Sequence, residues 1–239
     1  ERIKLEKQLL KSEKLSSLGK LSAGIAHEIN QPLTGVLTFA HLLAKKFKND
    51  EPTRKDLEII VRETTRVCRI VRGILDFARE MPMRKTPVRI EDVLEQTLEI
   101  IVHQQRFFGV DLIKDYSPNP NEVVVDANLM EQVFMNIILN ALDAMRGTGS
   151  LTIRTQQVDE WVEIQFQDTG CGMPEAIQDK IFDPFFTTKD STEGMGMGLG
   201  LAVSYGIVKN HNGDISVASK QGEGTTFLIK IPLKKIDSK

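Results

Sequence analysis

The chain contains little cysteine and no long apolar run. Its two cysteines, Cys68 and Cys171, lie far apart among 239 residues, which excludes a disulfide framework and a zinc site built on cysteines. No apolar stretch approaches the roughly 20 residues that a membrane helix needs, and no signal-peptide stretch opens the chain. We therefore expect a cytoplasmic protein. Because the sequence begins at Glu1, without a methionine and already in a helical pattern, we expect that an upstream part is missing and that any membrane attachment depends on it.

Neither sign of charge dominates the sequence. The 31 lysines and arginines nearly balance the 33 aspartates and glutamates, which leaves a net charge of −2 and a pI of about 6.2. A protein that grips a nucleic-acid backbone needs a basic surface, so a nucleic-acid partner is excluded. The hydrophobic fraction of 41% is sufficient for a packed core and excludes a disordered chain.

The sequence changes character near residue 86. Residues 1–80 are glycine-poor and helical in pattern, whereas later residues alternate β-rich runs with helices. Between the two parts lie Pro82 and Pro87, which cannot continue a helix. We expect two domains, over residues 1–86 and 87–239.

Apolar side chains in the first part recur at alternating spacings of three and four, as in the seam of a four-helix bundle. The seam residues are Leu57, Ile60, Thr64, Val67, Val71, Ile74 and Ala78, and an earlier helix repeats the spacing at Leu15, Leu18, Ser22, Ile25 and Ile29. Residues 48–52 are expected to form a turn, with Pro52 just before the second helix. Because one helical hairpin buries little apolar surface, we expect a homodimer in which two hairpins form a four-helix bundle. The alternative is a hairpin that packs on the second domain.

The second part is expected to be an α/β sandwich, which makes the whole chain α+β. Helices are expected over residues 91–106, 127–145, 175–181 and 199–210. Strands are expected over residues 110–116, 122–125, 150–158, 161–168, 214–219 and 225–231. Strands and helices in this order predict one mixed sheet with helices on one face.

His27 is the candidate nucleophile of the first part. Position 27 lies about 200° around the helix from the seam residue Ile25, so the imidazole is expected to point outward. Glu28 beside it could orient the ring or take its proton. Pro32 is expected to kink the helix just beyond the histidine. The alternative is a surface histidine without a function.

Three polar residues share one face of the expected helix over 127–145. Asn136, Asn140 and Asp143 are spaced by four and three residues, and the remaining positions are mostly apolar. Amides on a buried helix need partners or a ligand, and their carbonyl oxygens suit Mg²⁺. The alternative is that the amides cap neighbouring loops.

Asp168 ends a strand whose apolar residues alternate onto one face, which places its carboxylate at a core position. The glycines that follow, Gly170 and Gly172, allow a ligand to approach the backbone closely. The carboxylate could therefore accept a hydrogen bond from a buried amine such as that of adenine. The alternative is an ordinary Asp-x-Gly turn.

A second glycine-rich stretch runs from Gly194 to Gly200 and leads into an apolar helix. Its backbone N–H groups could bind an anion such as a polyphosphate. We expect residues 173–198 to form a mobile lid over the nucleotide. His211 follows at the end of this helix, where a partial positive charge is favourable.

Together these motifs resemble the catalytic core of a sensor histidine kinase of two-component signalling. The residues from His27 to Pro32 resemble its phosphoacceptor box. The helix with Asn136 and Asn140, the turn after Asp168, the segment 182–186 and the loop 196–201 resemble, in order, its N, G1, F and G2 boxes. Residues 222–227 are similar to the closing motif of the family.

The resemblance implies a dimerisation and phosphotransfer domain, with a connector helix over residues 1–20, followed by an ATP-binding domain of the Bergerat (GHKL) type. It implies a homodimer that uses ATP and Mg²⁺ to phosphorylate His27, with Glu28 as the acid/base residue, and passes the phosphoryl group to an aspartate of a response-regulator receiver domain. Asn136 and Asn140 would hold Mg²⁺. The implied ATP-binding residues are Asn136, Asn140, Asp143, Asp168, Gly170, Gly172, Phe182, Thr188, Lys189, Gly196, Gly198, Leu199, Gly200 and Thr225.

The sequence departs from related patterns at two positions. Gln31 stands four residues after His27, where family members that also dephosphorylate their regulator usually carry Thr or Asn; this leaves phosphatase activity open, although an amide could position a water. ATPases of the same superfamily carry a glutamate that activates water at the position of Asn136. An ATPase is therefore the competing class, and a non-catalytic dimeric scaffold is the third alternative.

Overall fold

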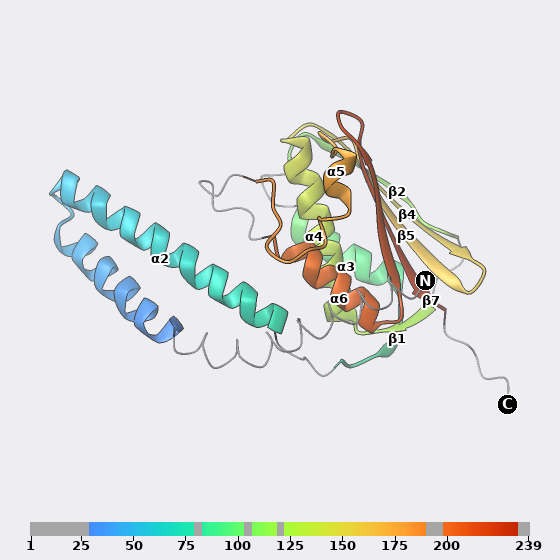
Figure 1. Ribbon diagram of the computed structural model, residues 1–239, viewed down its shortest axis with the longest axis horizontal. Coiled ribbons are helices and arrows are strands. Elements are labelled where there is room, and N and C mark those ends of the chain that lie inside the picture. Colours follow the sequence, from blue (N-terminus) through green and yellow to red (C-terminus); the bar gives the residue numbers. More distant parts are fainter. Residues whose placement is uncertain (1–28, 79–82, 103–106, 119–121, 190–197, 234–239) are drawn as a thin grey trace. The chain divides into compact units, whose positions relative to one another are not determined.

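The computed structural model describes residues 29–78, 83–102, 107–118, 122–189 and 198–233 (Figure 1). The chain divides into two compact units, one with residues 1–82 and 188–199 and the other with residues 83–187 and 200–239. No helix within the described ranges is both long and apolar enough to cross a membrane.

The first unit contains two helices joined by a short turn, as predicted. Residues 29–46 are helical, and α2 follows from Glu51 to Ala78. Asp50 caps α2, since its carboxylate accepts hydrogen bonds from the Thr53 hydroxyl at 2.8 Å and the Thr53 N–H at 3.4 Å. Pro52 is therefore the second residue of the helix and does not precede it as predicted, because the first turn of a helix tolerates a missing N–H.

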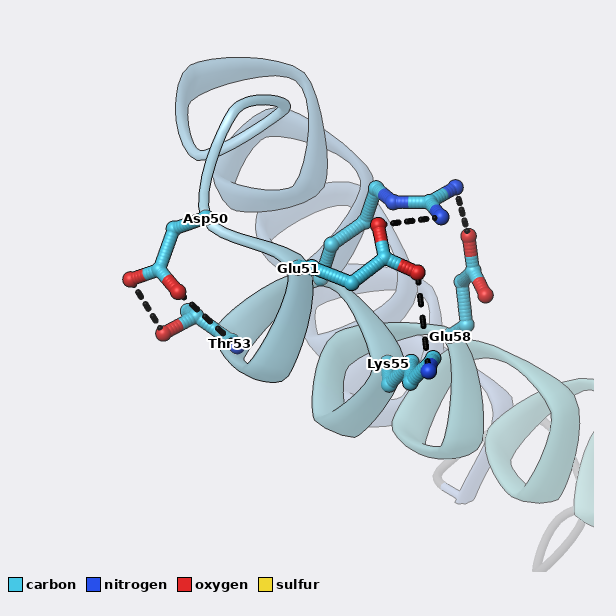
Figure 2. A network of polar contacts seen from close by, with 6 residues as sticks. Asp50, Glu51, Thr53, Lys55 and Glu58 are labelled. Carbon is cyan, nitrogen blue, oxygen red and sulfur yellow. Dashed lines mark hydrogen bonds and ion pairs between the residues drawn. The ribbon is translucent and has the colours of Figure 1, made fainter.

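Ion pairs on the first turns of α2 add to this cap. The Glu51 carboxylate pairs with the Arg54 guanidinium at 2.9 Å and with the Lys55 ammonium at 3.5 Å, and Glu58 pairs with Arg54 at 2.8 Å. Figure 2 shows Glu51, Lys55 and Glu58 at the start of this helix. All four side chains are exposed, so solvent screens each pair and its contribution to the stability of the helix is small. The network supports the start of α2 locally.

The predicted seam of α2 consists of two alternating heptad positions, and the described side chains at one of these positions are buried. Leu57, Thr64 and Val71 are buried, whereas Ile60 and Val67 are 44% and 40% exposed. On the preceding helix Ile29, predicted to be buried, is 39% exposed. The hairpin thus covers one heptad position and leaves the other open.

The second unit is built on a mixed five-stranded sheet with the order β2-β4-β5-β7-β6. Only β2 and β4 are parallel, and the other neighbours are antiparallel. In Figure 1 the longer helices cover one face of this sheet. The strands are β2 (Val110–Asp115), β4 (Gly149–Val158), β5 (Trp161–Asp168), β6 (Asp214–Lys220) and β7 (Gly224–Pro232), and the helices are α3 (Ile90–Val102), α4 (Ala127–Met145), α5 (Glu175–Gln178) and α6 (Gly200–Asn210). The predicted α/β sandwich is confirmed.

The structure differs from the prediction at a second, two-stranded sheet. β1 (Thr86–Arg89) pairs antiparallel with β3 (Glu122–Val125) outside the main sheet, so the unit does not contain a single sheet. The segment was predicted to be linker because of Pro87, but proline is tolerated in a strand at a sheet edge. The short helix α5 also ends at Gln178, three residues earlier than predicted.

The core of the second unit lies between the main sheet and α4. The apolar face of α4 is fully buried and packs on the inward side chains of the strands, with the Phe134 and Phe166 rings 5.6 Å apart. Asp126 caps the start of α4, and Arg146 ends it in the left-handed conformation. α4 is therefore held rigidly at both ends and along its length.

Candidate functional site

Asp168 is the last residue of β5 and is only 4% exposed. Its carboxylate accepts a hydrogen bond from the Gly170 N–H at 2.8 Å and one from the backbone of Thr225, its cross-strand partner on β7. Burial raises the pKa of this carboxyl group, while the two backbone donors oppose the rise. The result is a fixed, buried acceptor suited to an amine of a ligand.

The loop after β5 fits closely between α4 and the β6–β7 hairpin. A Cβ atom on Gly170 would lie 2.8 Å from Ala144 of α4, and one on Gly172, whose φ is +62°, would lie 2.0 Å from the Lys220 carbonyl oxygen. The Cys171 N–H also donates to the Ala144 carbonyl oxygen at 3.2 Å. Only glycine fits at these two positions, and the close fit brings Asp168 near the C-terminal half of α4.

Ser219 holds this arrangement together from β6. Its hydroxyl accepts a hydrogen bond from the Met173 N–H at 2.8 Å, donates to the Gly224 carbonyl oxygen at 2.9 Å and lies 3.0 Å from the Thr225 hydroxyl. This role could not be predicted from the sequence, because a serine in an edge strand has no motif of its own.

The three polar residues of α4 are half-buried along one face, as their spacing predicted. The Asn136 side-chain amide donates to the Gly200 carbonyl oxygen at 3.1 Å and to the Ser204 hydroxyl at 3.2 Å. Asn136 therefore ties α4 to the N-terminus of α6, the helix that follows the glycine-rich stretch. Asn140 and Asp143 lie one and two turns further along α4, toward the Asp168 loop.

This face fits a magnesium ion better than a tightly bound transition metal. Throughout the described parts of the chain, no three His, Cys, Asp or Glu side chains are grouped so that they could hold a metal ion. Asn140 and Asp143 offer amide and carboxylate oxygens, which are the ligands Mg²⁺ takes when substrate phosphates and water complete its shell.

Phe182 packs against α6. Its ring centroid lies 5.6 Å from that of Tyr205, whose ring also carries the Lys209 ammonium at 5.4 Å. The contact joins the segment after α5 to α6, the helix to which Asn136 also donates hydrogen bonds.

The other predicted site residues belong to the first unit or lie outside the described residues. Gln31 is exposed on the helix over residues 29–46. Thr188, Lys189, Gly198 and Leu199 belong to the first unit, and Gly198 has a positive φ of +64°. His27, Glu28 and Gly196 lie outside the described residues. The structure thus brings together Asp168, Gly170, Gly172 and Thr225, and separately Asn136 and Gly200.

His211 was predicted to benefit from a positive charge at a helix end, and this prediction is wrong. The residue is 2% exposed; its Nε2 accepts a hydrogen bond from the Asp126 N–H at 2.9 Å, and its Nδ1 lies 2.8 Å from the Ile207 carbonyl oxygen. Burial lowers the pKa of the imidazole, so the ring is held neutral. The position of His211 at a helix end does not indicate that its hydrogen-bond partner is Asp126, which lies 85 residues away in the sequence.

Comparisons with known proteins match the chain in two regions. Residues 125–235 match the family described as histidine kinase-, DNA gyrase B- and HSP90-like ATPase, and residues 17–81 match the His Kinase A (phospho-acceptor) domain. The order of the two matches along the chain is the order that the motifs predicted.

Similar curated proteins are sensor kinases. The signal transduction histidine-protein kinase AtoS of Escherichia coli (strain K12) is 34% identical over 95% of this chain and 37% of its own length. The sensor kinase CckA of Brucella abortus is 34% identical over 95% of this chain and 25% of its length, and sporulation kinase E of Bacillus subtilis is 33% identical over 98% and 31%. The chain therefore spans well under half the length of these relatives.

Solved structures agree with the fold. Histidine kinase ThkA in complex with the response regulator protein TrrA is 27% identical, with a TM-score of 0.68 over 97% of this chain and 66% of that chain. Full-length ShkA in complex with AMPPNP is 24% identical, with a TM-score of 0.72 over 90% of this chain and 46% of that chain, which shows a shared fold. With a phospho-acceptor region and an ATP-binding region matched in order, and with relatives over nearly its whole length, the chain belongs to the sensor histidine kinase family and comprises its catalytic core.

Proposed function

We propose that this chain is an ATP-dependent protein histidine kinase that phosphorylates His27 and passes the phosphoryl group to an aspartate of a response-regulator receiver domain. The observation that carries the proposal is the buried Asp168 carboxylate, fixed by two backbone donors beside α4. The matched phospho-acceptor region and the kinase relatives support it.

In this function Asp168 accepts a hydrogen bond from the adenine amine, with Gly170, Gly172 and Thr225 shaping the pocket around it. Asn136, Asn140 and Asp143 face the phosphates, and Asn136 and Asn140 hold Mg²⁺. Mg²⁺ supplies neutralisation of the phosphate charge that phosphoryl transfer requires. The residues proposed to close over the nucleotide are Phe182, Thr188, Lys189, Gly196, Gly198, Leu199 and Gly200.

The transfer step forms a bond between a ring nitrogen of His27 and the γ-phosphorus while the bond to the ADP oxygen breaks. Glu28 takes the proton from the other ring nitrogen, which keeps the imidazole nucleophilic. An aspartate oxygen of the receiver domain then attacks the phosphorus of the phosphohistidine, the N–P bond breaks, and Glu28 returns the proton to the other ring nitrogen, which restores the neutral imidazole. Gln31, exposed on the helix over residues 29–46, could position a water for the separate phosphatase reaction on the regulator.

The alternative of a water-activating ATPase is disfavoured at Asn136. An asparagine has no basic oxygen that can take a proton from water, and its amide nitrogen is already bound to Gly200 and Ser204. Without a base at this position, hydrolysis is slow and transfer to a positioned histidine is favoured.

The division at residue 86 into a dimerisation and phosphotransfer domain and an ATP-binding domain is part of this proposal. The exposed Ile60 and Val67 on α2 supply an apolar face for a second copy of the hairpin, which would complete a four-helix bundle. The likeness to a kinase solved with its response regulator supports the receiver domain as the partner.

The proposal is tested by incubating the chain with γ-labelled ATP and Mg²⁺. We expect wild type and His41→Ala to take up label equally, since His41 is an exposed histidine on the same helical hairpin. His27→Ala should bind ATP with unchanged affinity and take up none. Equal labelling of His27→Ala would overturn the assignment of the acceptor.

A further inference from the structure

Three segments distant in the sequence meet at Asp126, which is 8% exposed. One carboxylate oxygen, Oδ1, caps α4 by accepting hydrogen bonds from the Asn128 and Leu129 N–H groups, both at 3.2 Å. The other oxygen, Oδ2, accepts a hydrogen bond from the Arg84 N–H at 2.8 Å. The cap of α4 is thus also an anchor for the residues that open the second unit.

His211 brings the end of α6 to the same point. Its Nε2 accepts a hydrogen bond from the Asp126 N–H, so Nδ1 carries the proton and donates to the Ile207 carbonyl oxygen. The Lys85 ammonium adds a bond to the Asn210 carbonyl oxygen at 2.8 Å. Residues 83–85 are therefore fastened to the start of α4 and to the end of α6.

Both helices also carry residues of the proposed nucleotide site, at a distance from Asp126 and His211. α4 bears Asn136 and Asn140, and α6 begins at Gly200, which the Asn136 amide binds. Asn136 lies about 15 Å along α4 from Asp126, at 1.5 Å per residue. Hydrogen bonds thus join the two helices at two separate places, at Asn136 and at Asp126. Arg84 and Lys85 form their bonds at the Asp126 end.

We propose that Asp126 and His211 form a joint that fixes the nucleotide-site helices to the segment arriving from the phospho-acceptor region, and that His211 is a positioning residue for phosphoryl transfer. This inference rests on the proposed function. Transfer depends on placing the γ-phosphate within bonding distance of an acceptor, and a displacement of about 1 Å can slow such a step by about 100-fold. On this proposal the joint determines where the γ-phosphate lies relative to its acceptor, and the contacts that bind ATP do not depend on it.

A matched pair at Arg84 tests the connection to residues 83–85. Arg84→Ala keeps the backbone N–H that Asp126 accepts, whereas Arg84→Pro removes it without altering either helix. A second set, His211→Leu and His211→Gln, tests the ring, because the leucine leaves the Asp126 N–H unpaired while the glutamine offers an amide oxygen in its place.

The measurements are the autophosphorylation rate at saturating Mg-ATP and the dissociation constant of Mg-ATP by calorimetry, both on the full chain. We expect Arg84→Pro and His211→Leu to slow phosphorylation by about tenfold, the equivalent of one buried hydrogen bond, with ATP affinity unchanged. Arg84→Ala should match wild type, and His211→Gln should recover most of the rate.

Wild-type rates in Arg84→Pro and His211→Leu would overturn the joint, as would a loss confined to ATP affinity with a normal rate at saturation. A failure of His211→Gln to recover the rate would overturn the role assigned to the Nε2 acceptor. If wild type binds ATP but takes up no label, the proposed function fails, and the positioning role fails with it. The two failures are therefore distinguishable.

Discussion

At the residue scale, the loop that holds the proposed adenine acceptor Asp168 depends on a glycine that no other residue can replace. A Cβ on Gly170 would approach both Ala144 and the Asp168 carboxylate within 3 Å, so any side chain pushes the loop away from α4. Gly206, in the interior of α6, has no atom within 4 Å of the position of an added Cβ. The two glycines therefore offer a direct comparison.

We expect Gly170→Ala to lower the free energy of unfolding by about 1–3 kcal/mol, as in other overpacked sites, and to weaken ATP binding at least tenfold, as about 1.4 kcal/mol of lost contact would. Gly206→Ala should stabilise the protein by up to about 1 kcal/mol, because alanine favours a helix. Urea unfolding and calorimetry measure both. Wild-type ATP affinity in Gly170→Ala would show that the loop is not part of the site.

The buried His211 predicts a pH dependence of stability. Burial lowers its pKa in the folded protein below the ordinary value of 6.5, and the nearby Lys85 ammonium lowers it further, while the Ile207 carbonyl and Asp126 oppose the shift. The unfolded chain therefore binds a proton first as the pH falls. The stability that the neutral ring contributes is complete above pH 6.5 and is lost as the pH falls through the folded-state pKa.

The expected result is that the difference in unfolding free energy between wild type and His211→Gln changes in favour of the glutamine variant below pH 6.5 and is constant above it. Urea titrations between pH 8 and pH 5.5 measure this difference. A difference that does not vary with pH would mean that the folded-state pKa of His211 is not lowered.

Sequence reasoning located single residues well where the cause was local. The alternating pattern of β5 placed Asp168 at a core position, and the structure buries it. His211 was misread because its partner, Asp126, is 85 residues away. Ile29 was predicted to be buried by the seam spacing, yet it is 39% exposed, because spacing alone does not say which element covers a face.

At the element scale, α4 was predicted with its correct bounds. Asp126 supplies a strong N-cap and Gly147 follows the end of the apolar pattern, so both limits are set by local chemistry. β1 was missed because four residues with a proline carry no strand pattern and gain their hydrogen bonds only from β3, which is distant in the sequence. Elements with internal signals were predictable, and elements defined by a remote partner were not.

The face of α4 leads to a test of the magnesium ligand. Asn140→Ala should lose at least about tenfold of the Mg²⁺-dependent part of ATP affinity, since one charge-neutralising contact is worth about 1.4 kcal/mol or more. Asn128→Ala is the control, because Asn128 is exposed on the first turn of the same helix. Calorimetry with and without Mg²⁺ measures the effect, and equal affinities for the two variants would exclude Asn140 as the ligand.

The open seam position of α2 leads to a test of the dimer. We expect Ile60→Lys with Val67→Lys to dissociate the dimer at micromolar concentration, because two charges would be buried in the bundle core. Ile59→Lys, at a neighbouring residue that is equally exposed but outside the seam, should remain dimeric. Light scattering on the full chain distinguishes them, and a dimer that survives the double change would place the interface elsewhere.

At the scale of the whole molecule, the change of pattern near residue 86 predicts two domains, over residues 1–86 and 87–239. The chain divides into two compact units, and the first of them includes residues 188–199 as well as residues 1–82. The hydrogen bonds that hold the first residues of the second unit could not be predicted from the sequence. They link Arg84, Asp126 and His211, which lie in three segments far apart along the chain.

The most direct test of this account follows the γ-phosphate in a single turnover with labelled Mg-ATP. The account predicts that the label appears on the protein, maps to His27, is lost in acid and is kept in alkali, as expected for a phosphohistidine, with little free phosphate. Free phosphate that accumulates while the protein stays unlabelled would contradict it and would make the chain an ATPase.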